Sequence, residues 1–138
     1  PYSVFDIREE YCNQRRYPNA EGNFCSSVED FLKSESKESL ARFSDILLLS
    51  HDWSVDEEML VGLLRVCKEG SRPRIGAIGS KKKWSAFEKK ALESGVEKRL
   101  IDSVRCPIGL DIGADTPEEI AIAVCAEVLS LERKNVST

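Results

Sequence analysis

Short apolar runs, each bounded by polar or glycine-containing segments, recur along this 138-residue chain. Three of them predict β-strands, at Tyr2–Phe5, Ile46–Leu49 and Arg74–Ile78. The run Ile46–Leu49 contains no polar residue, which is typical of a strand buried on both faces. The polar stretch from Asp6 to Ser27 predicts mostly loop.

Helical periodicity fills the segments between and after these strands. It predicts short helical turns over Val28–Lys33 and part of Ser36–Ser44, and longer helices over Val55–Lys68 and Lys82–Glu93. A last helix begins at Thr116, where Thr-Pro-Glu-Glu supplies an N-cap, a first-turn proline and the acid of a capping box. Its predicted buried stripe comprises Ile120, Val124, Val128 and Leu131.

The alternation of strands and helices predicts an α/β fold, a Rossmann-like three-layer parallel sheet forming one domain over residues 1–138. Right-handed crossovers place the carboxyl ends of parallel strands at one edge, where open α/β sheets bind ligands. Three polar clusters follow strand ends, at Asp6–Arg8, Ser50–Asp52 and Gly79–Lys83. We therefore expect these clusters to meet along a single rim.

Composition narrows the class of protein further. Twenty basic residues against 24 acidic ones give a net charge of −4, which argues against a broad nucleic-acid surface. The apolar runs are far shorter than the ~18 residues that cross a membrane, so no membrane partner is expected. Five cysteines without any CxxC pair argue against a disulfide framework or a zinc site and favour the cytoplasm. They are Cys12, Cys25, Cys67, Cys106 and Cys125, which we expect to be mainly buried or inert. Cys106, beside Pro107, is the strongest candidate among them for a functional thiol.

Each polar cluster admits both a binding role and a structural one. Asp6 could accept a hydrogen bond from a ribose hydroxyl, or it could form a turn beside a solvated Arg8. His51, the single histidine, could act as an acid or simply be a hydrogen-bonded loop residue. Asp52 could cap the following helix, and Asp56 offers the same structural role.

The lysine run after the third strand gives the most specific chemical signal. Cations in the first turn of a helix interact unfavourably with the helix dipole. A bound anion would offset this interaction for Lys81, Lys82 and Lys83. Gly79 would let a ligand approach the backbone, and Ser80 adds a hydroxyl. The alternative is a solvated first turn without a ligand.

Four segments carry a resemblance to a known family: PIGLDIGADTPEEIA at 107–121, LSHD at 49–52, IGAIGSKKK at 75–83 and FDIREE at 5–10. Together they resemble the C-terminal Rossmann domain of the xanthine dehydrogenase accessory family (XdhC/CoxI-like). The motifs occur in the family's order, and the resemblance spans about residues 2–133. Together with the strand-end clusters it yields the candidate cofactor-binding residues Asp6, Arg8, His51, Asp52, Gly79, Ser80, Lys81, Lys82, Gly109, Asp111 and Gly113. Of these, we assign Gly79, Ser80 and the lysines to phosphate, Asp6 to a hydroxyl or amine, and Gly109 and Gly113 to the shape of a rim loop.

The resemblance implies a maturation factor rather than a catalyst. Such a protein binds the molybdenum cofactor, as molybdopterin or its dinucleotide form, assists its sulfuration with a cysteine desulfurase, and delivers it to a xanthine dehydrogenase-like molybdenum hydroxylase. A homodimer is expected. The alternative is an NAD(P)-binding oxidoreductase or a nucleotide-binding regulatory domain, although the chain has no G-x-G-x-x-G fingerprint.

The chain departs from the family pattern at its start. The family's domain opens with a strand and a glycine-rich turn that are missing before Tyr2–Phe5, as is the family's separate cysteine-bearing domain. In a Rossmann strand order that strand lies between Tyr2–Phe5 and Ile46–Ser50. We therefore expect a preceding segment or a partner chain to supply it, because unpaired apolar edges invite pairing.

Overall fold

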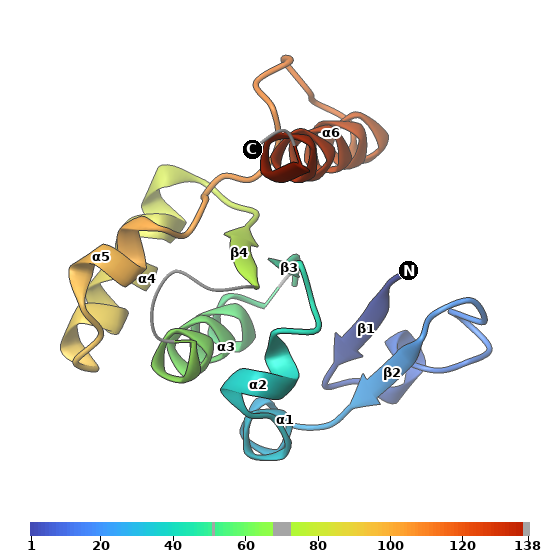
Figure 1. Cartoon of the computed structure of the whole chain (residues 1–138), viewed down its shortest axis with the longest axis horizontal. Helices are drawn as coiled ribbons and strands as arrows, with labels where there is room; N and C mark the ends of the chain where they lie inside the picture. The colour runs from blue at the N-terminus through green and yellow to red at the C-terminus, as the bar shows by residue number, and fades with distance from the viewer. Residues whose placement is uncertain (51, 68–72, 137–138) are drawn as a thin grey trace.

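The structure is a computed structural model, and it describes residues 1–50, 52–67 and 73–136. Figure 1 shows the elements in chain order. They are β1 (Ser3–Asp6), a 3-10 helix (Glu9–Tyr11), β2 (Gly22–Cys25), α1 (Val28–Ser34), α2 (Lys37–Leu40), β3 (Asp45–Leu48), α3 (Trp53–Val66), β4 (Arg74–Ala77), α4 (Lys81–Glu93), α5 (Lys98–Asp102) and α6 (Pro117–Val136).

All strand pairs in the described ranges are parallel, as the α/β prediction requires. β1 pairs with β2, with Ser3 opposite Gly22, and β3 pairs with β4, with Asp45 opposite Arg74. The segment before the loop that leads to α6 adds a parallel bridge from Arg105 to β4. Within residues 1–50, 52–67 and 73–136 the strands form two two-stranded sheets rather than one continuous sheet.

The strand β2 and the helix α5 are elements that the sequence did not predict. The segment from Asp6 to Ser27 was expected to be mostly loop, and that was wrong for Gly22–Cys25. This strand is short and has little apolar alternation, so its pattern is weak. Its position is fixed by pairing with β1 and by Phe24, whose ring centroid lies 5.8 Å from that of Phe31 in α1.

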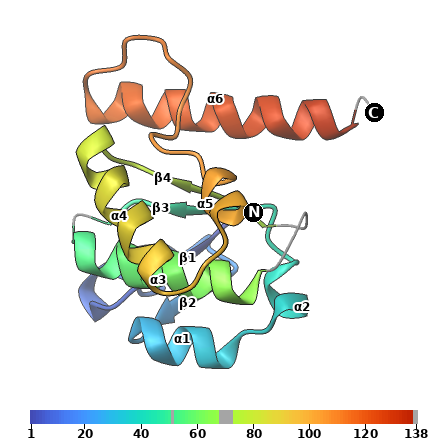
Figure 2. The same cartoon turned by 90° about the vertical axis from the view of Figure 1, so that its left-hand side faces the viewer.

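The core lies around α3, which packs between α1 and α4. Gly62 permits the close approach of α1, because a Cβ at this position would stand 2.1 Å from Leu32 Cδ1. The largest fully buried side chains are Phe87, Leu40, Leu60, Leu63 and Ile101. Figure 2 shows α6 on the opposite side of β3 and β4 from α3. The two strands are thus the middle layer of a three-layer arrangement.

Two burial predictions need correction. Along β3 only Leu48 is buried, while Ile46 and Leu47 are half-buried and the next residue, Leu49, is 56% exposed. The strand is less buried than expected because, within the described ranges, β3 has a strand neighbour only on its β4 side and its other edge is open. In α4, helical spacing predicts Leu92 on the apolar side together with Trp84, Phe87 and Ala91, but Leu92 is 45% exposed.

The start of α6 agrees with the sequence. The Thr116 hydroxyl accepts the backbone N–H of Glu119, and the Glu119 carboxylate accepts the N–H of Thr116 at 3.0 Å. Its inner face is centred on Ala123 and Val124, which are buried, with the rest of the predicted stripe half-buried. Among the described residues no helix is both long enough and apolar enough to cross a membrane.

Candidate functional site

The carboxyl ends of β3 and β4 lie side by side. The two strands are parallel and in register to Leu48 and Ala77, and the Ile78 N–H donates to the Leu48 carbonyl at 3.0 Å. Figure 2 shows that α3, α4 and α6 all begin on the same side of the molecule. The expected rim therefore exists for the two clusters that follow β3 and β4.

A buried ion pair joins these two strand ends. Lys83 Nζ lies 3.2 Å from Asp56 Oδ2, and both side chains are only 4% exposed. The same ammonium group donates to the Ile78 carbonyl at 2.8 Å, while the Asp56 carboxylate accepts the backbone N–H of Ser50. The pair thus links the segment after β3 to the segment after β4.

Burial governs the protonation of Asp56. It raises the pKa of Asp56 above its ordinary value, although Lys83 and the Ser50 N–H favour the charged form. Sequence reasoning considered Asp56 only as a cap and grouped Lys83 with the phosphate-binding lysines. The signal that distinguishes Lys83 from Lys81 and Lys82 is its spacing. It stands one turn before the buried Phe87, whose ring centroid is 5.3 Å from Lys83 Nζ.

The start of α4 carries two exposed lysines. Lys81 and Lys82 are exposed, and the first turn of α4 contains no acidic residue. The Ser80 hydroxyl accepts the Lys83 N–H at 3.2 Å and is the N-cap of the helix. Gly79 has φ +149°, and a Cβ there would stand 2.4 Å from Lys83 Cδ, so only glycine fits between the strand and the buried lysine.

The cluster after β3 serves first to cap α3. The Asp52 carboxylate accepts both the N–H and the hydroxyl of Ser54, at 2.9 and 2.6 Å. The Ser50 hydroxyl in turn accepts the Asp52 N–H at 3.0 Å. His51 lies outside the described residues. The structural role anticipated for Asp52 is confirmed.

The cluster after β1 belongs to the other two-stranded sheet. Its Asp6 carboxylate accepts the Arg8 backbone N–H at 2.9 Å and the Arg8 guanidinium at 3.1 and 3.2 Å. The guanidinium also lies over the Tyr11 ring, 4.0 Å from its centroid. These contacts form the turn that the structural alternative predicted, and a binding role for Asp6 and Arg8 stays a prediction.

The loop before α6 approaches the same rim. Cys106 Sγ lies 4.0 Å from the Gly79 carbonyl oxygen, and the peptide bond to Pro107 is cis. Burial raises the pKa of the Cys106 thiol, although the positive charge of Lys83 acts in the opposite direction. The sequence offered no sign that Cys106 lies near Gly79, because 27 positions separate these two residues in the chain.

Two glycines shape that loop, as predicted. Gly109 has φ +108° and packs against α6, where its N–H donates to Glu127 Oε2 at 3.1 Å. Gly113 has φ +73°, and it is exposed, as is Asp111. The structure thus connects Gly109 to the body of the domain and leaves Asp111 and Gly113 at the surface. Across the described ranges no cluster of His, Cys, Asp and Glu could hold a metal ion.

A three-layer parallel α/β unit with capped helix starts at the carboxyl ends of its strands is a Rossmann-like domain. The family model of the XdhC Rossmann domain matches residues 1–128, and the chain therefore belongs to the XdhC Rossmann-domain family.

Two known proteins show the extent of the similarity. A crystal structure of a xanthine dehydrogenase from Bacillus halodurans, at 2.80 Å resolution, superposes on 99% of this chain with a TM-score of 0.74 and 27% identity. The uncharacterized protein YqeB of Escherichia coli (strain K12) is 40% identical over 58 residues, or 42% of this chain. The chain spans 38% of the former protein and 11% of the latter.

Proposed function

We propose that this domain binds the phosphorylated end of the molybdenum cofactor at the start of α4 and serves in the maturation of a xanthine dehydrogenase-like molybdenum hydroxylase. Membership of the XdhC family supports the accessory role, as does the similarity to a protein described as a xanthine dehydrogenase. The observation that carries the binding site is the placement of Lys81 and Lys82, two exposed cations in a first turn without acidic residues.

The residues present suit a phosphate group. The first N–H groups of a helix have no intrahelical partner, and together with the positive end of the dipole they attract anions. Ser80 accepts a hydrogen bond from the Lys83 N–H, which leaves its own hydroxyl proton available for a phosphate oxygen. Lys81 and Lys82 would then neutralise the charge of the bound phosphate. Lys83 would fix the loop between β4 and α4 through its hydrogen bond to the Ile78 carbonyl.

The domain acts here as a holder of the cofactor and not as a catalyst. The bound cofactor supplies molybdenum redox chemistry only in the recipient enzyme. We assign the supply of sulfur to a separate cysteine desulfurase, because burial raises the pKa of the Cys12, Cys67 and Cys106 thiols and keeps them protonated. A protonated thiol is a poor nucleophile for persulfide formation.

The test is a comparison of two ligands and two double variants in the full-length protein. Lys81→Ala with Lys82→Ala should weaken binding of molybdopterin at least about tenfold, since each charge-assisted contact contributes ~1.5–3 kcal/mol. The same variant should bind a dephosphorylated pterin analogue as the parent does. Ser80 is left intact because it caps α4, so its removal would also cost stability.

The matched control is Lys89→Ala with Lys90→Ala, which removes two exposed lysines from the other end of the same helix. It changes the net charge equally and should leave both affinities unchanged. Equal losses for the two ligands, or for the two double variants, would refute a phosphate site at the start of α4. Tight binding of NADH or NADPH in place of molybdopterin would favour the nicotinamide alternative.

A further inference from the structure

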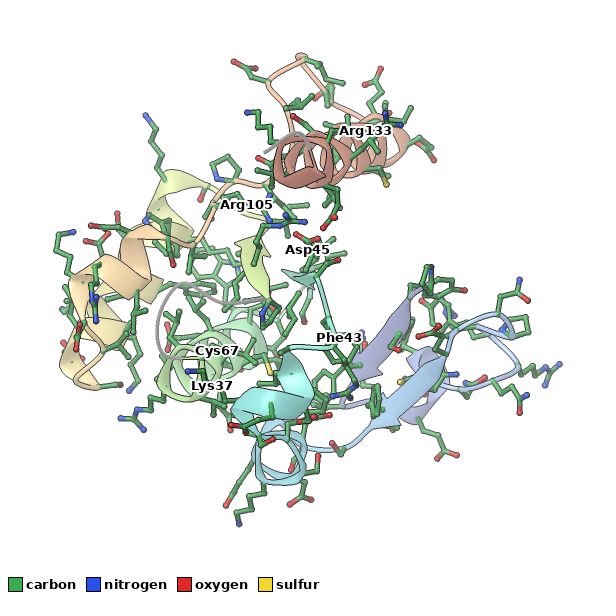
Figure 3. All side chains as sticks on the ribbon, in the orientation of Figure 1. Lys37, Phe43, Asp45, Cys67, Arg105 and Arg133 are labelled. Carbon is green, nitrogen blue, oxygen red and sulfur yellow. The ribbon has the colours of Figure 1, made fainter. Side chains whose placement is uncertain are left out.

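The inner face of α6 is already occupied. Glu127 pairs with Arg105 at 2.5 Å, and Glu132 pairs with Arg74 at 2.6 Å, so two carboxylates of the helix are tied to the edge of the β3–β4 pair. The backbone of Leu110 donates to the Ala123 carbonyl at 3.1 Å on the side of the loop. Figure 3 shows Arg105 between β4 and α6. These contacts fix which way the helix faces.

The opposite face of α6 carries a second apolar stripe that no described element covers. We define the outer stripe as Glu118, Ile122, Cys125, Ala126, Leu129 and Arg133, which recur at spacings of three and four and so share one face of the helix. Ile122 is 62% exposed and Leu129 is 55% exposed. A helix with apolar residues on two opposite faces has a second surface that can be buried against a partner.

The order of residues in the outer stripe is complementary to itself in reverse. An acid stands at its start and a base at its end, with an apolar residue one turn inside each of them. In an antiparallel pair of α6 helices the twofold axis passes between Cys125 and Ala126. Ile122 then faces Leu129 of the second copy, and Glu118 faces Arg133 of the second copy.

We propose that the outer stripe of α6 is a homodimer interface in which two α6 helices pack antiparallel. A parallel arrangement would instead put Glu118 against its own counterpart and Arg133 against its own, which is unfavourable. No ion pair joins either residue to another described residue, so both are available for the contact. The small side chains of Cys125 and Ala126 at the crossing allow a short distance between the helix axes.

The first experiment measures the oligomeric state of the full-length protein by sedimentation equilibrium. The parent protein should be a dimer, and Ile122→Glu should weaken dimerisation at least about tenfold, because it places a charge against Leu129 of the second copy. Leu92→Glu is the matched control, since Leu92 is also an exposed aliphatic residue on a helix but lies on α4, outside the outer stripe. A monomeric parent protein, or equal effects of the two variants, would overturn the proposal.

A charge exchange tests the antiparallel arrangement itself. Glu118→Arg and Arg133→Glu each create like charges across the interface and should each weaken dimerisation severalfold. The double variant restores opposite charges and should return the dissociation constant close to that of the parent. Both positions are on the surface, so the domain should remain folded, as circular dichroism will verify. A double variant that is as weak as the sum of the single ones would overturn the pairing.

The position of Cys125 near the twofold axis provides an independent readout. A disulfide needs Cα atoms about 4.4–6.8 Å apart, which an antiparallel pair with small residues at its crossing can reach. Diamide, which is reduced as it oxidises two thiols to a disulfide, should therefore cross-link the parent protein and Cys25→Ser into covalent dimers, but not Cys125→Ser. Cys25 is the matched control because it is likewise exposed. Cross-linking that depends on Cys25 instead would refute the interface, whatever the outcome of the cofactor-binding test.

Discussion

The ammonium group of Lys83 lies 3.2 Å from the Asp56 carboxylate, and both side chains are almost fully shielded from water. The pair joins the starts of α3 and α4 and, through the Ile78 carbonyl and the Ser50 N–H, the ends of β4 and β3. The pair therefore fixes the segments that carry the proposed phosphate site, while Lys81 and Lys82 remain at the surface.

Lys83→Met should destabilise the domain by about 3–5 kcal/mol, because it leaves the Asp56 carboxylate buried without its counter-charge. Asp56→Leu combined with Lys83→Met should recover part of this loss, since no unpaired charge then remains. Urea unfolding followed by circular dichroism measures both effects. Lys82→Met is the control and should change the free energy of unfolding very little, because its side chain is exposed. A comparable loss for Lys82→Met would contradict the assignment of the structural role to Lys83.

The raised pKa of Asp56 predicts a specific pH dependence of stability. Between the ordinary carboxyl pKa near 4 and the raised value, the folded state binds more protons at this site than the unfolded state does. The contribution of Asp56 to the free energy of unfolding therefore falls as the pH rises through that interval, and it is constant above it. The difference in stability between the parent and Asp56→Asn should shrink over the same interval in urea titrations at a series of pH values. A difference that grows with pH would mean that the pKa of Asp56 is lowered.

Gly79→Ala and Gly95→Ala separate backbone strain from steric conflict. Both glycines have positive φ, so either substitution should cost about 1–3 kcal/mol for the backbone conformation alone. A Cβ at Gly95 meets no atom within 4 Å, whereas a Cβ at Gly79 would overlap the Lys83 side chain. Thermal unfolding should therefore show the larger loss for Gly79→Ala. Combining it with Lys83→Ala, which removes the Cγ and Cδ atoms that the new Cβ would meet, should remove most of the excess, and an undiminished excess would contradict the proposed steric cause.

The cysteines should not contribute to cofactor binding. Single replacement of each by serine or alanine should leave the affinity for molybdopterin within a few-fold of that of the parent, as isothermal titration will show. Burial raises the pKa of the Cys106 thiol, so its alkylation by iodoacetamide at neutral pH should be much slower than that of the exposed Cys25. Mass spectrometry of the alkylated peptides gives both rates. Loss of persulfide formation in Cys106→Ser, with the fold intact, would assign sulfur chemistry to this domain.

Much of the local structure was predictable because it depends on neighbours in the chain. The Thr116–Glu119 capping box, the helix α3 with its apolar periodicity and the strands at residues 45–48 and 74–77 all followed from short-range patterns. The family was predictable too, from a glycine-rich segment that leads into the last helix. By contrast, β2 was missed, because its four residues form a strand only through pairing with β1.

The amino-acid sequence by itself determined the parallel α/β class, the helix caps and the polar clusters that follow the strands, since periodicity and capping are properties of adjacent residues. Only the tertiary structure decided which lysine of the run is buried, because that depends on Asp56, which lies 27 positions earlier. It likewise placed Cys106 beside Gly79 and left Ile122 and Leu129 of α6 exposed within the described part of the chain. A carboxylate and an ammonium group far apart in the chain have no detectable sequence relationship, yet once both are buried each requires the other, and that requirement fixes the geometry of the site.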